Sequence, residues 1–388
     1  MKLKQQPEDF QVEEISRVVA GAEGPFAFYR LEKRGWTTPD AVAVVRRRWG
    51  VEPQRISYGG LKDRHARTVQ YLTIFHGPRR GLKQQDIHVE YLGQVEAAYA
   101  SSDIDRNHFQ LTVRDLEADA RQGLEAELAL LSVEGVPNYF DDQRFGSVAG
   151  IEGEFIARLL VKGRCEGALR LALVAPYEHD RAAQKSEKRL LEAHWGDWAT
   201  LTRKLAPGDT WRLIEYLRVR ADDYRGALAQ LRPDLRTLYL SAYQSHLWNR
   251  LLAAWLRRHC QADRLRPVAL RLGEVPFHAG LEEETLRQLA ALSLPLMSAR
   301  LKLADEDPLA ALVQEVMAEE GLALRDMQVR GIRELFFSRG ERPALCLPTG
   351  LQHSFEDDEL RSGRHKLRLG FDLPRGSYAT LIVKRLFG

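Results

Sequence analysis

The most informative stretch of the sequence reads Tyr58-Gly59-Gly60-Leu61-Lys62-Asp63-Arg64-His65-Ala66-Arg67-Thr68-Val69-Gln70. It places one carboxylate, Asp63, between two cations and shortly after a pair of glycines. Glycine lets the backbone turn tightly and approach a ligand, and neighbouring cations favour an ionised carboxylate and can meet phosphate. An ionised, positioned Asp can act as a nucleophile or as a base. Asp63 is therefore the first candidate for catalysis, although such a charged turn is also typical of a solvated loop.

Both sides of this stretch have the alternating pattern of β-strands. Residues 54–58 lead into the two glycines, and residues 68–75 place Val69, Tyr71, Thr73 and Phe75 on one face. Asp63 is thus expected on a connection between two strands. Loops that are held by a rigid scaffold carry reactive groups more often than other segments do.

Further elements are predicted from capping residues and periodicity. A helix is expected with Thr38 as its N-cap, Pro39 in its first turn and Gly50 at its end. A second helix is expected at about residues 119–131, followed by a loop at 135–140. Additional strands are predicted at residues 26–33, 108–114, 366–372 and 378–383.

The order of these patterns predicts two domains, for which 388 residues are long enough. From about residue 150 strand signals become scarce and helical ones dominate, and strand character returns near the C-terminus. We therefore predict an α+β fold in which residues 1–150 plus 336–388 form one domain and residues 151–335 form an inserted, helix-rich domain.

Composition and the termini limit the class of protein. A hydrophobic content of 44% with 29% charged residues is ordinary for a soluble globular chain. No apolar run is long enough to span a bilayer, and the N-terminus lacks the apolar core of a secretory signal, so we expect a cytoplasmic protein. The three widely spaced cysteines predict reduced thiols and no structural metal. A monomer is the simplest expectation.

Basic residues are concentrated in two segments. Residues 30–67 hold ten Lys or Arg against four acids, a local charge of +6, and residues 362–388 hold six against one, a local charge of +5. If the fold brings the two segments together, they would form a nucleic-acid footprint, and the affinity would fall steeply with salt. Two independently solvated faces remain the alternative on charge alone.

Five motifs, spread from the first residues to nearly the last, together resemble the TruD family of tRNA pseudouridine synthases. They are Lys4-x-x-Pro7-Glu8-Asp9-Phe10-x-Val12-Glu13-Glu14, Gly60-Leu61-Lys62-Asp63-x-x-Ala66-x-Thr68-x-Gln70, Gly135-Val136-Pro137-Asn138-Tyr139-Phe140-x-x-Gln143-Arg144-Phe145-Gly146, Ser241-Ala242-Tyr243-Gln244-Ser245 and Leu373-Pro374-x-Gly376-Ser377-Tyr378-Ala379-Thr380. The stretches 151–235 and 261–330 match the family only in their helical character.

The resemblance implies a catalytic domain with a mixed, largely antiparallel sheet flanked by helices, and an inserted TRUD domain of α/β type. It also implies isomerisation of a uridine in tRNA, typically uridine-13 of the D arm, to pseudouridine without metal or cofactor. Asp63 stands at the position of the family's essential Asp, which attacks the nucleotide or abstracts a proton while the base is detached. Both routes remain open.

The resemblance also assigns residues to the substrate. An enzyme that acts on a base must extrude it and hold it by stacking and by hydrogen bonds to its edge. Phe10, Phe140 and Tyr378 are the stacking candidates, and Asn138 offers a donor and an acceptor to a uracil edge. The family often has Phe at the position of Tyr378. Burial in the core is the alternative for the two phenylalanines, and capping of a turn is the alternative for Asn138.

Four cations complete the predicted site. Lys4 is expected near Asp63 or near a phosphate. Lys62, Arg64 and Arg144 are expected to contact RNA phosphates, although Arg144 could instead hold Asp63 or simply begin a helix.

Two rival functions remain at this point. A metal-dependent phosphodiesterase could use Asp141-Asp142 or Glu356-Asp357-Asp358-Glu359, but carboxylates adjacent in sequence point in different directions and are usually solvated. A non-catalytic RNA-binding protein would use the same basic and aromatic residues. Substitution of Asp63 separates binder from enzyme, because a binder would lose nothing specific.

Overall fold

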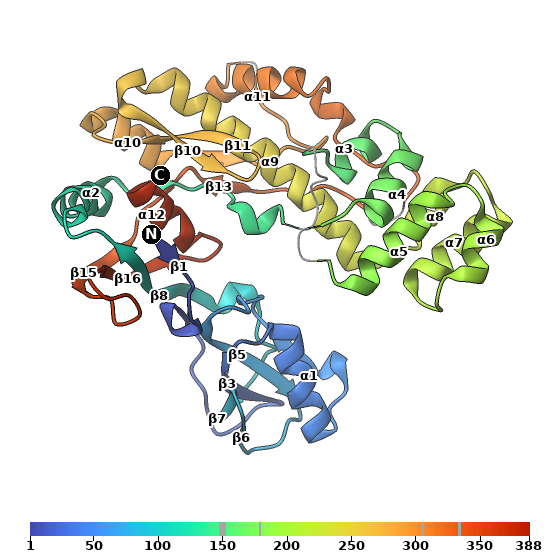
Figure 1. Cartoon of the computed structure of the whole chain (residues 1–388), viewed down its shortest axis with the longest axis horizontal. Helices are drawn as coiled ribbons and strands as arrows, with labels where there is room; N and C mark the ends of the chain where they lie inside the picture. The colour runs from blue at the N-terminus through green and yellow to red at the C-terminus, as the bar shows by residue number, and fades with distance from the viewer. Residues whose placement is uncertain (147–152, 178–179, 305, 333–334) are drawn as a thin grey trace. The chain divides into compact units, whose positions relative to one another are not determined.

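A computed structural model of the chain describes residues 1–146, 153–177, 180–304, 306–332 and 335–388 (Figure 1). The chain divides into two compact units, one of Met1–Val136 with Cys346–Phe387 and one of Pro137–Leu345 with Gly388. The first unit is thus built from both ends of the chain, and the second is nearly continuous in sequence. The predicted boundary between residues 150 and 151 lies outside the described residues, and the predicted domain limits stay a prediction.

A ten-stranded sheet dominates the first unit. Its central path runs in the order β15-β16-β8-β2-β5-β3-β7-β6, while β1 pairs with β8 and β4 pairs with β5. The strands are β1 (Lys2–Leu3), β2 (Phe10–Ser16), β3 (Phe26–Arg34), β4 (Ile56–Tyr58), β5 (Arg67–Phe75), β6 (Leu82–Gln84), β7 (Ile87–Val95), β8 (Ile104–Leu116), β15 (Thr349–Asp357) and β16 (His365–Pro374).

The pairing of β2 with β5 is parallel, with Val12 opposite Thr68, whereas the other recorded pairings of this sheet are antiparallel. The predicted α+β class with a mixed, largely antiparallel sheet is therefore confirmed. The predicted strands at 26–33, 68–75, 108–114 and 366–372 are all present. In the segment 54–58 the strand is shorter than predicted, because a 3₁₀ turn occupies Pro53–Arg55 before β4.

Helix α1 (Thr38–Trp49) covers the part of the sheet that leads to the Asp63 loop (Figure 1). Its buried side chains, which include Val42 and Val45, pack against Tyr29, Leu31 and Leu72 of β3 and β5. The predicted N-cap was displaced by one residue. Thr37 caps the helix by accepting a hydrogen bond from the backbone N–H of Asp40, and Thr38 is the first helical residue.

The C-terminal segment corrects one prediction. Residues 378–383 were expected to be a strand, but Ala379–Phe387 is helix α12. Ala379, Ile382, Val383 and Leu386 recur at helical spacing and are buried, so tertiary packing outweighs the strand propensity. Helix α12 packs on α2 (Ala120–Glu134), where Arg385 pairs with Glu127.

The second unit is mostly helical (Figure 1). Its helices are α3 (Ile156–Val161), α4 (Cys165–Val174), α5 (Ala182–Ala193), α6 (Trp198–Lys204), α7 (Asp209–Val219), α8 (Tyr224–Ala229), α9 (Pro233–His259), α10 (Glu283–Ala291) and α11 (Pro308–Glu319). Of its short helices, α3 and α11 pack on the long helix α9, while α4 to α8 pack on one another. Two small antiparallel sheets pair β10 (Leu265–Leu270) with β11 (Gly273–His278) and β12 (Ser293–Pro295) with β13 (Glu341–Pro343).

The segment expected as a loop at 135–140 begins with a two-residue strand, β9 (Val136–Pro137), which pairs with β14 (Leu345–Cys346). Gly135 is required here, because a Cβ atom would lie 2.5 Å from the carbonyl oxygen of Cys346 and φ is +63°.

Two negative observations apply to the described ranges. No helix within them is long and apolar enough to cross a bilayer. They also hold no group of three or more His, Cys, Asp or Glu side chains that could bind a metal ion.

Candidate active site

The loop between β4 and β5 places Asp63 where the sequence predicted it, between two strands. Its side chain is 22% exposed, so it can be reached from solvent while most of it is enclosed. The ammonium group of Lys4 donates a hydrogen bond of 2.7 Å to Asp63 Oδ2. The two residues are 59 positions apart in sequence, and the structure brings them into direct contact.

Lys4 is itself held in an unusual way. Its φ angle is +57°, in the left-handed region that side chains other than Gly, Asn and Asp seldom adopt. Its Nζ lies 3.9 Å from the centroid of the Phe10 ring, within the range of a cation–π interaction. Phe10 is only 4% exposed and also packs edge-on against Phe109, at 6.3 Å between centroids. In this structure Phe10 therefore supports Lys4 from the core.

The backbone of the loop is held by a buried lysine that the sequence analysis counted only as part of a basic segment. Lys33, on β3, is 1% exposed. Its ammonium group donates to the carbonyl oxygens of Trp36, Lys62 and Asp63, at 2.7, 3.3 and 2.8 Å. Burial lowers the pKa of Lys33 to about 8; the charge of Asp63 opposes this shift and that of Lys62 adds to it.

Two neutral polar side chains tie down the same loop from the other side. The hydroxyl of Thr38 accepts a hydrogen bond from the backbone N–H of Lys62 and donates to Gln70 Oε1, at 2.9 and 2.8 Å. Gln70 Nε2 donates to the carbonyl oxygen of Gly60 at 3.2 Å. The residue predicted to cap α1 thus connects that helix to the Asp63 loop.

Lys62 points into the protein. Its side chain is 11% exposed, and its ammonium group lies 2.9 Å from Glu14 Oε2 and donates to Asn107 Oδ1 at 2.6 Å. Glu14 is buried and also accepts a hydrogen bond of 2.8 Å from the hydroxyl of Tyr99. Burial, with a smaller contribution from the Glu14 charge, raises the pKa of Tyr99 above its usual value. The predicted phosphate contact of Lys62 would require both of its internal contacts to break.

The two glycines before the loop differ in their role. A Cβ atom on Gly59 would lie 2.8 Å from Ile104 Cδ1 and 3.1 Å from Tyr99 Cε1, so the backbone packs tightly against these side chains. A Cβ atom on Gly60 would meet nothing within 4 Å. The close approach in this structure is therefore to the protein's own core, at Gly59.

The remaining predicted residues of the first unit lie at its surface or partly within it. Arg64 is exposed, next in sequence to Asp63. Tyr378 is half-buried and directly precedes α12, after the turn in which Gly376 has a φ of +81°.

In the second unit, Phe140 is surrounded by cations. The Arg342 guanidinium lies 4.4 Å from the centroid of its ring and that of Arg144 lies 5.7 Å away. The ring packs edge-on against Trp248, at 5.5 Å. Asn249, on α9, clamps the backbone: its Oδ1 accepts from the N–H of Phe140 and its Nδ2 donates to the carbonyl, each at 2.8 Å.

Asn138 is 4% exposed, and its amide is engaged by the protein. Its Oδ1 accepts a hydrogen bond of 2.6 Å from Arg342, and its Nδ2 donates to the carbonyl oxygen of Pro343 at 3.0 Å. Arg342 also donates to the backbone carbonyl of Asn138 at 2.9 Å. Asn138 therefore orients the cation that stacks on Phe140, and a bond to a uracil edge would need these contacts to rearrange.

The motif at 241–245 lies on α9 and supports the same loop. Ser245 accepts a hydrogen bond of 3.1 Å from Arg144 Nε, and the Ser245 hydroxyl donates to the carbonyl oxygen of Ser241 at 2.7 Å. Gln244 donates to the carbonyl oxygens of Met297 and Ser338, both at 2.9 Å. The motif is thus structural, and it fixes the Arg144 side chain.

The sequence model of the family described as tRNA pseudouridine synthase D (TruD) matches residues 1–386. The chain belongs to the TruD family. Over its whole length it is 31% identical to a Methanocaldococcus jannaschii protein named "Probable tRNA pseudouridine synthase D 2", of which 92% is covered. It is 29% identical to the tRNA pseudouridine synthase D of Aquifex aeolicus, over 100% of this chain and 98% of that protein.

A solved structure supports the same assignment. The crystal structure of a protein assigned to TruD from Methanosarcina mazei matches with a TM-score of 0.72 and 25% identity, covering 99% of this chain and 92% of the other. The resemblance that the five motifs suggested is therefore confirmed, and the chain is a tRNA pseudouridine synthase, an enzyme of the isomerase class.

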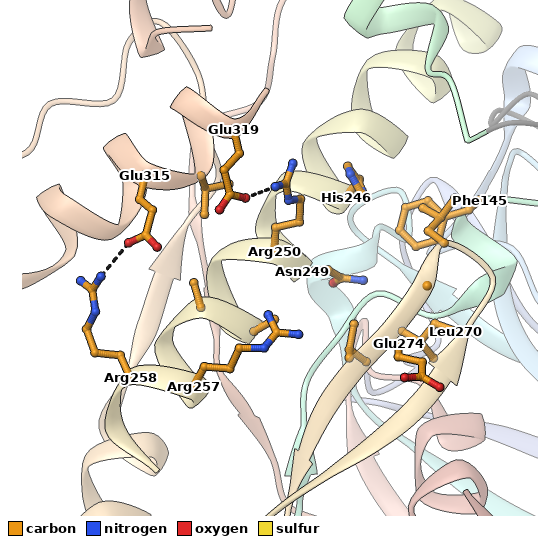
Figure 2. A pocket seen from close by; sticks show the side chains of 16 residues that line it. Phe145, His246, Asn249, Arg250, Arg257, Arg258, Leu270, Glu274, Glu315 and Glu319 are labelled. Carbon is orange, nitrogen blue, oxygen red and sulfur yellow. Dashed lines mark hydrogen bonds and ion pairs between the residues drawn. The ribbon is translucent and has the colours of Figure 1, made fainter. Parts of the chain in front are cut away.

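The TruD chain also has a pocket of about 660 Å³ within its second unit (Figure 2). It is lined by helices α9 and α11 and by the β10–β11 hairpin. Asn249 of α9 and Phe145 also contribute to the lining. Several of its charges are paired with one another: Arg258 lies 2.6 Å from Glu315, and Arg250 pairs with Glu319. A lining of nearly balanced, paired charges favours no particular class of ligand.

In the acidic run proposed for a rival metal enzyme, Asp358 belongs to a buried ion-pair cluster and the half-exposed Glu359 joins this cluster from the surface. Arg114 contacts Asp358 at 2.7 Å, Glu359 at 3.0 Å and Asp9 at 2.9 Å. Lys366 also pairs with Glu359. These carboxylates join the N-terminal segment to β8 and to the β15–β16 connection, so this TruD chain uses them for structure.

The structure thus gathers Lys4, Phe10 and Asp63 in the first unit and Asn138, Phe140 and Arg144 in the second. Sequence reasoning missed three supporting residues. Lys33 binds the backbone of Asp63, Asn249 binds the backbone of Phe140, and Arg342 lies over the Phe140 ring. For Lys33 a signal existed, because it shares the alternating face of β3 with the buried residues Tyr29 and Leu31.

Proposed function

We propose that this TruD enzyme converts uridine-13, in the D arm of tRNA, to pseudouridine, with Asp63 as the essential anion. The observation that carries the proposal is the carboxylate of an Asp63 side chain that is 22% exposed, on a loop fixed from several sides, with the ammonium of Lys4 at 2.7 Å. A reactive group that is both reachable and rigidly held is what a positioned nucleophile or base requires.

The reaction is an isomerisation. The bond between ribose C1′ and uracil N1 breaks, the base turns, and a bond between C1′ and C5 forms. The proton lost from C5 is balanced by the one gained at N1, so the reaction needs no oxidant, reductant or second substrate. Asp63 either attacks the nucleotide or abstracts a proton while the base is detached.

Lys4 is proposed to hold the Asp63 carboxylate in one orientation until the uridine arrives. Its positive φ and its position over the Phe10 ring fix its ammonium group at that carboxylate. Because pairing with Lys4 would restrain an attacking carboxylate, the ion pair must loosen or swing when the substrate binds. Stacking by Tyr378 and Phe140 and phosphate contact by Arg64 and Arg144 remain parts of the same proposal.

The proposal is tested by pseudouridine formation in unmodified tRNA transcripts, with tRNA binding followed in parallel. The enzymes are the wild type, Asp63→Asn and the matched control Asp105→Asn. Asp105 is also a partly exposed carboxylate of the first unit, paired with Arg17 at 2.8 Å. A transcript with cytidine in place of uridine-13 controls for the position of the reaction.

We expect the wild type and Asp105→Asn to convert uridine-13 alone and Asp63→Asn to bind tRNA without converting it. Conversion in the transcript that lacks uridine-13 would contradict the assigned position. Full turnover by Asp63→Asn would contradict the assigned residue.

A further inference from the structure

Lys33 is a buried cation in direct contact with the backbone of the candidate catalytic residue. We propose that Lys33 is a positioning residue for the TruD reaction: its ammonium group fixes the peptide of Asp63, so that turnover, but not tRNA binding, depends on Lys33 keeping its proton. This inference rests on the proposed role of Asp63.

The geometry matches donors to acceptors. A protonated lysine has three N–H donors, and Lys33 Nζ lies 2.7, 3.3 and 2.8 Å from the carbonyl oxygens of Trp36, Lys62 and Asp63. A neutral amine has two donors and one lone pair. Loss of the proton would therefore leave one carbonyl oxygen without its donor and facing a lone pair, in a place from which solvent is nearly excluded.

The charges that face Lys33, together with its burial, set the pH at which its ammonium group loses the proton. Asp63 attracts its proton and Lys62 repels it, and the paired positions on the neighbouring strands, Thr68 of β5 and Ile87 of β7, are uncharged. Helix α1 contributes the neutral hydroxyl of Thr38 to the same loop. Burial outweighs these effects and brings the pKa to about 8, so the protonated form is lost as the pH rises through that value.

The consequence for the reaction follows from the position of the bonds. Asp63 carries both the carboxylate and one of the carbonyl oxygens that Lys33 holds, so a shift of this peptide moves the reacting oxygen. A displacement of about 1 Å at a reacting group can lower the rate about 10²-fold. Lys33 as a whole is 1% exposed, so RNA should not reach its ammonium group and binding should be unaffected.

The test measures single-turnover pseudouridine formation and tRNA affinity for the wild type, Lys33→Met, Lys33→Arg and Lys366→Met, from about pH 6.5 to about pH 9.5. Lys33→Met keeps the apolar stem without donors, and Lys33→Arg keeps a charge that is not titrated in this range. Lys366→Met is the matched control, because Lys366 is also a buried lysine of the first unit but pairs with Glu356 and Glu359.

We expect Lys33→Met to lose about 10²-fold in rate, with affinity within about twofold of the wild type, and Lys366→Met to keep its rate. The wild type should lose rate as the pH rises through about 8, whereas Lys33→Arg should not. Equal alkaline losses in the wild type and Lys33→Arg would overturn the inference, and so would a wild-type rate in Lys33→Met. If Lys33→Met does not fold, the comparison of the two pH profiles still decides.

Failure of the proposed function looks different. If the wild type forms no pseudouridine, or Asp63→Asn is fully active, the role of Asp63 and this inference fall together. If Asp63→Asn is inactive and Lys33→Met is as fast as the wild type, only the role of Lys33 is refuted.

Discussion

Replacing Lys62 by Met separates a structural role from an RNA contact. The Glu14 carboxylate is fully buried, and the Lys62 ammonium group at 2.9 Å is the cation paired with it. Removal of one partner from a buried ion pair typically costs about 3–5 kcal/mol, because the other charge is left uncompensated. Glu14 keeps the hydroxyl of Tyr99 at 2.8 Å, and Lys62 is 11% exposed, so we expect the lower end of that range, about 3 kcal/mol.

The loss should be visible in thermal unfolding. For a folding unit of about 150–250 residues, as the first unit is, 1 kcal/mol corresponds to about 2–4 °C, so Lys62→Met should lower the Tm of that unit's transition by about 6–12 °C. The double variant Lys62→Met with Glu14→Gln removes the buried charge and should recover most of the loss. Arg64→Met, an exposed neighbour on the same loop, should change stability by less than about 0.5 kcal/mol.

The refuting result is specific. If Lys62→Met unfolds like the wild type but binds tRNA more weakly, with a salt slope lower by about one, Lys62 contacts a phosphate as the sequence alone suggested. The internal pair with Glu14 would then contribute little to stability.

Three further outcomes follow from the contacts. Asn249→Ala removes both hydrogen bonds to the Phe140 backbone and should cost about 2 kcal/mol in urea unfolding of the second unit; a loss below about 0.5 kcal/mol would contradict the clamp. Arg64→Met should lower the salt slope of tRNA binding by about one without changing the single-turnover rate; an unchanged slope would exclude a phosphate contact. Burial raises the pKa of Asp358, but hydrogen bonds, led by that from Arg114, lower it by more than burial raises it, so the net shift is downward. The ionised form of Asp358 therefore contributes stability that is present above its unfolded-state pKa of about 4 and is lost as the pH falls through the folded-state pKa. Unfolding of Asp358→Asn in urea should thus be less sensitive to acid than unfolding of the wild type, and equal sensitivity would refute this.

Much of the secondary structure of the first unit could be predicted from the sequence. The strand–loop–strand arrangement around Asp63 followed from alternation and glycines, and the five motifs identified the family. Alternation fails where propensity and packing disagree. The β-branched pair Ile382-Val383 reads as a strand, but the face shared by Ala379, Ile382 and Leu386 is buried as a helix.

The supporting contacts could not be predicted, because they join residues far apart in sequence through backbone atoms. Nothing local indicates that Asn249 clamps the backbone of Phe140, which lies 109 positions away, or that Asn138 orients Arg342 across 204 positions. A family motif indicates that a residue is needed, but it does not show whether that residue contacts the substrate or positions another side chain.

The same distinction changes how the basic segment 30–67 is interpreted. Its local charge of +6 suggested an RNA footprint, but the side chains of Lys33 and Lys62 are largely buried and make contacts inside the protein. Arg34 and Arg67 are offset by Glu8 and Glu32, at 2.6 and 2.7 Å. A cation inside the fold cannot contact a phosphate, so it displaces no condensed counterion from the RNA when RNA binds. The charge count therefore overstates what this segment can give to a phosphate backbone, and its exposed cations, Arg64 among them, are where electrostatic binding to tRNA has to be tested.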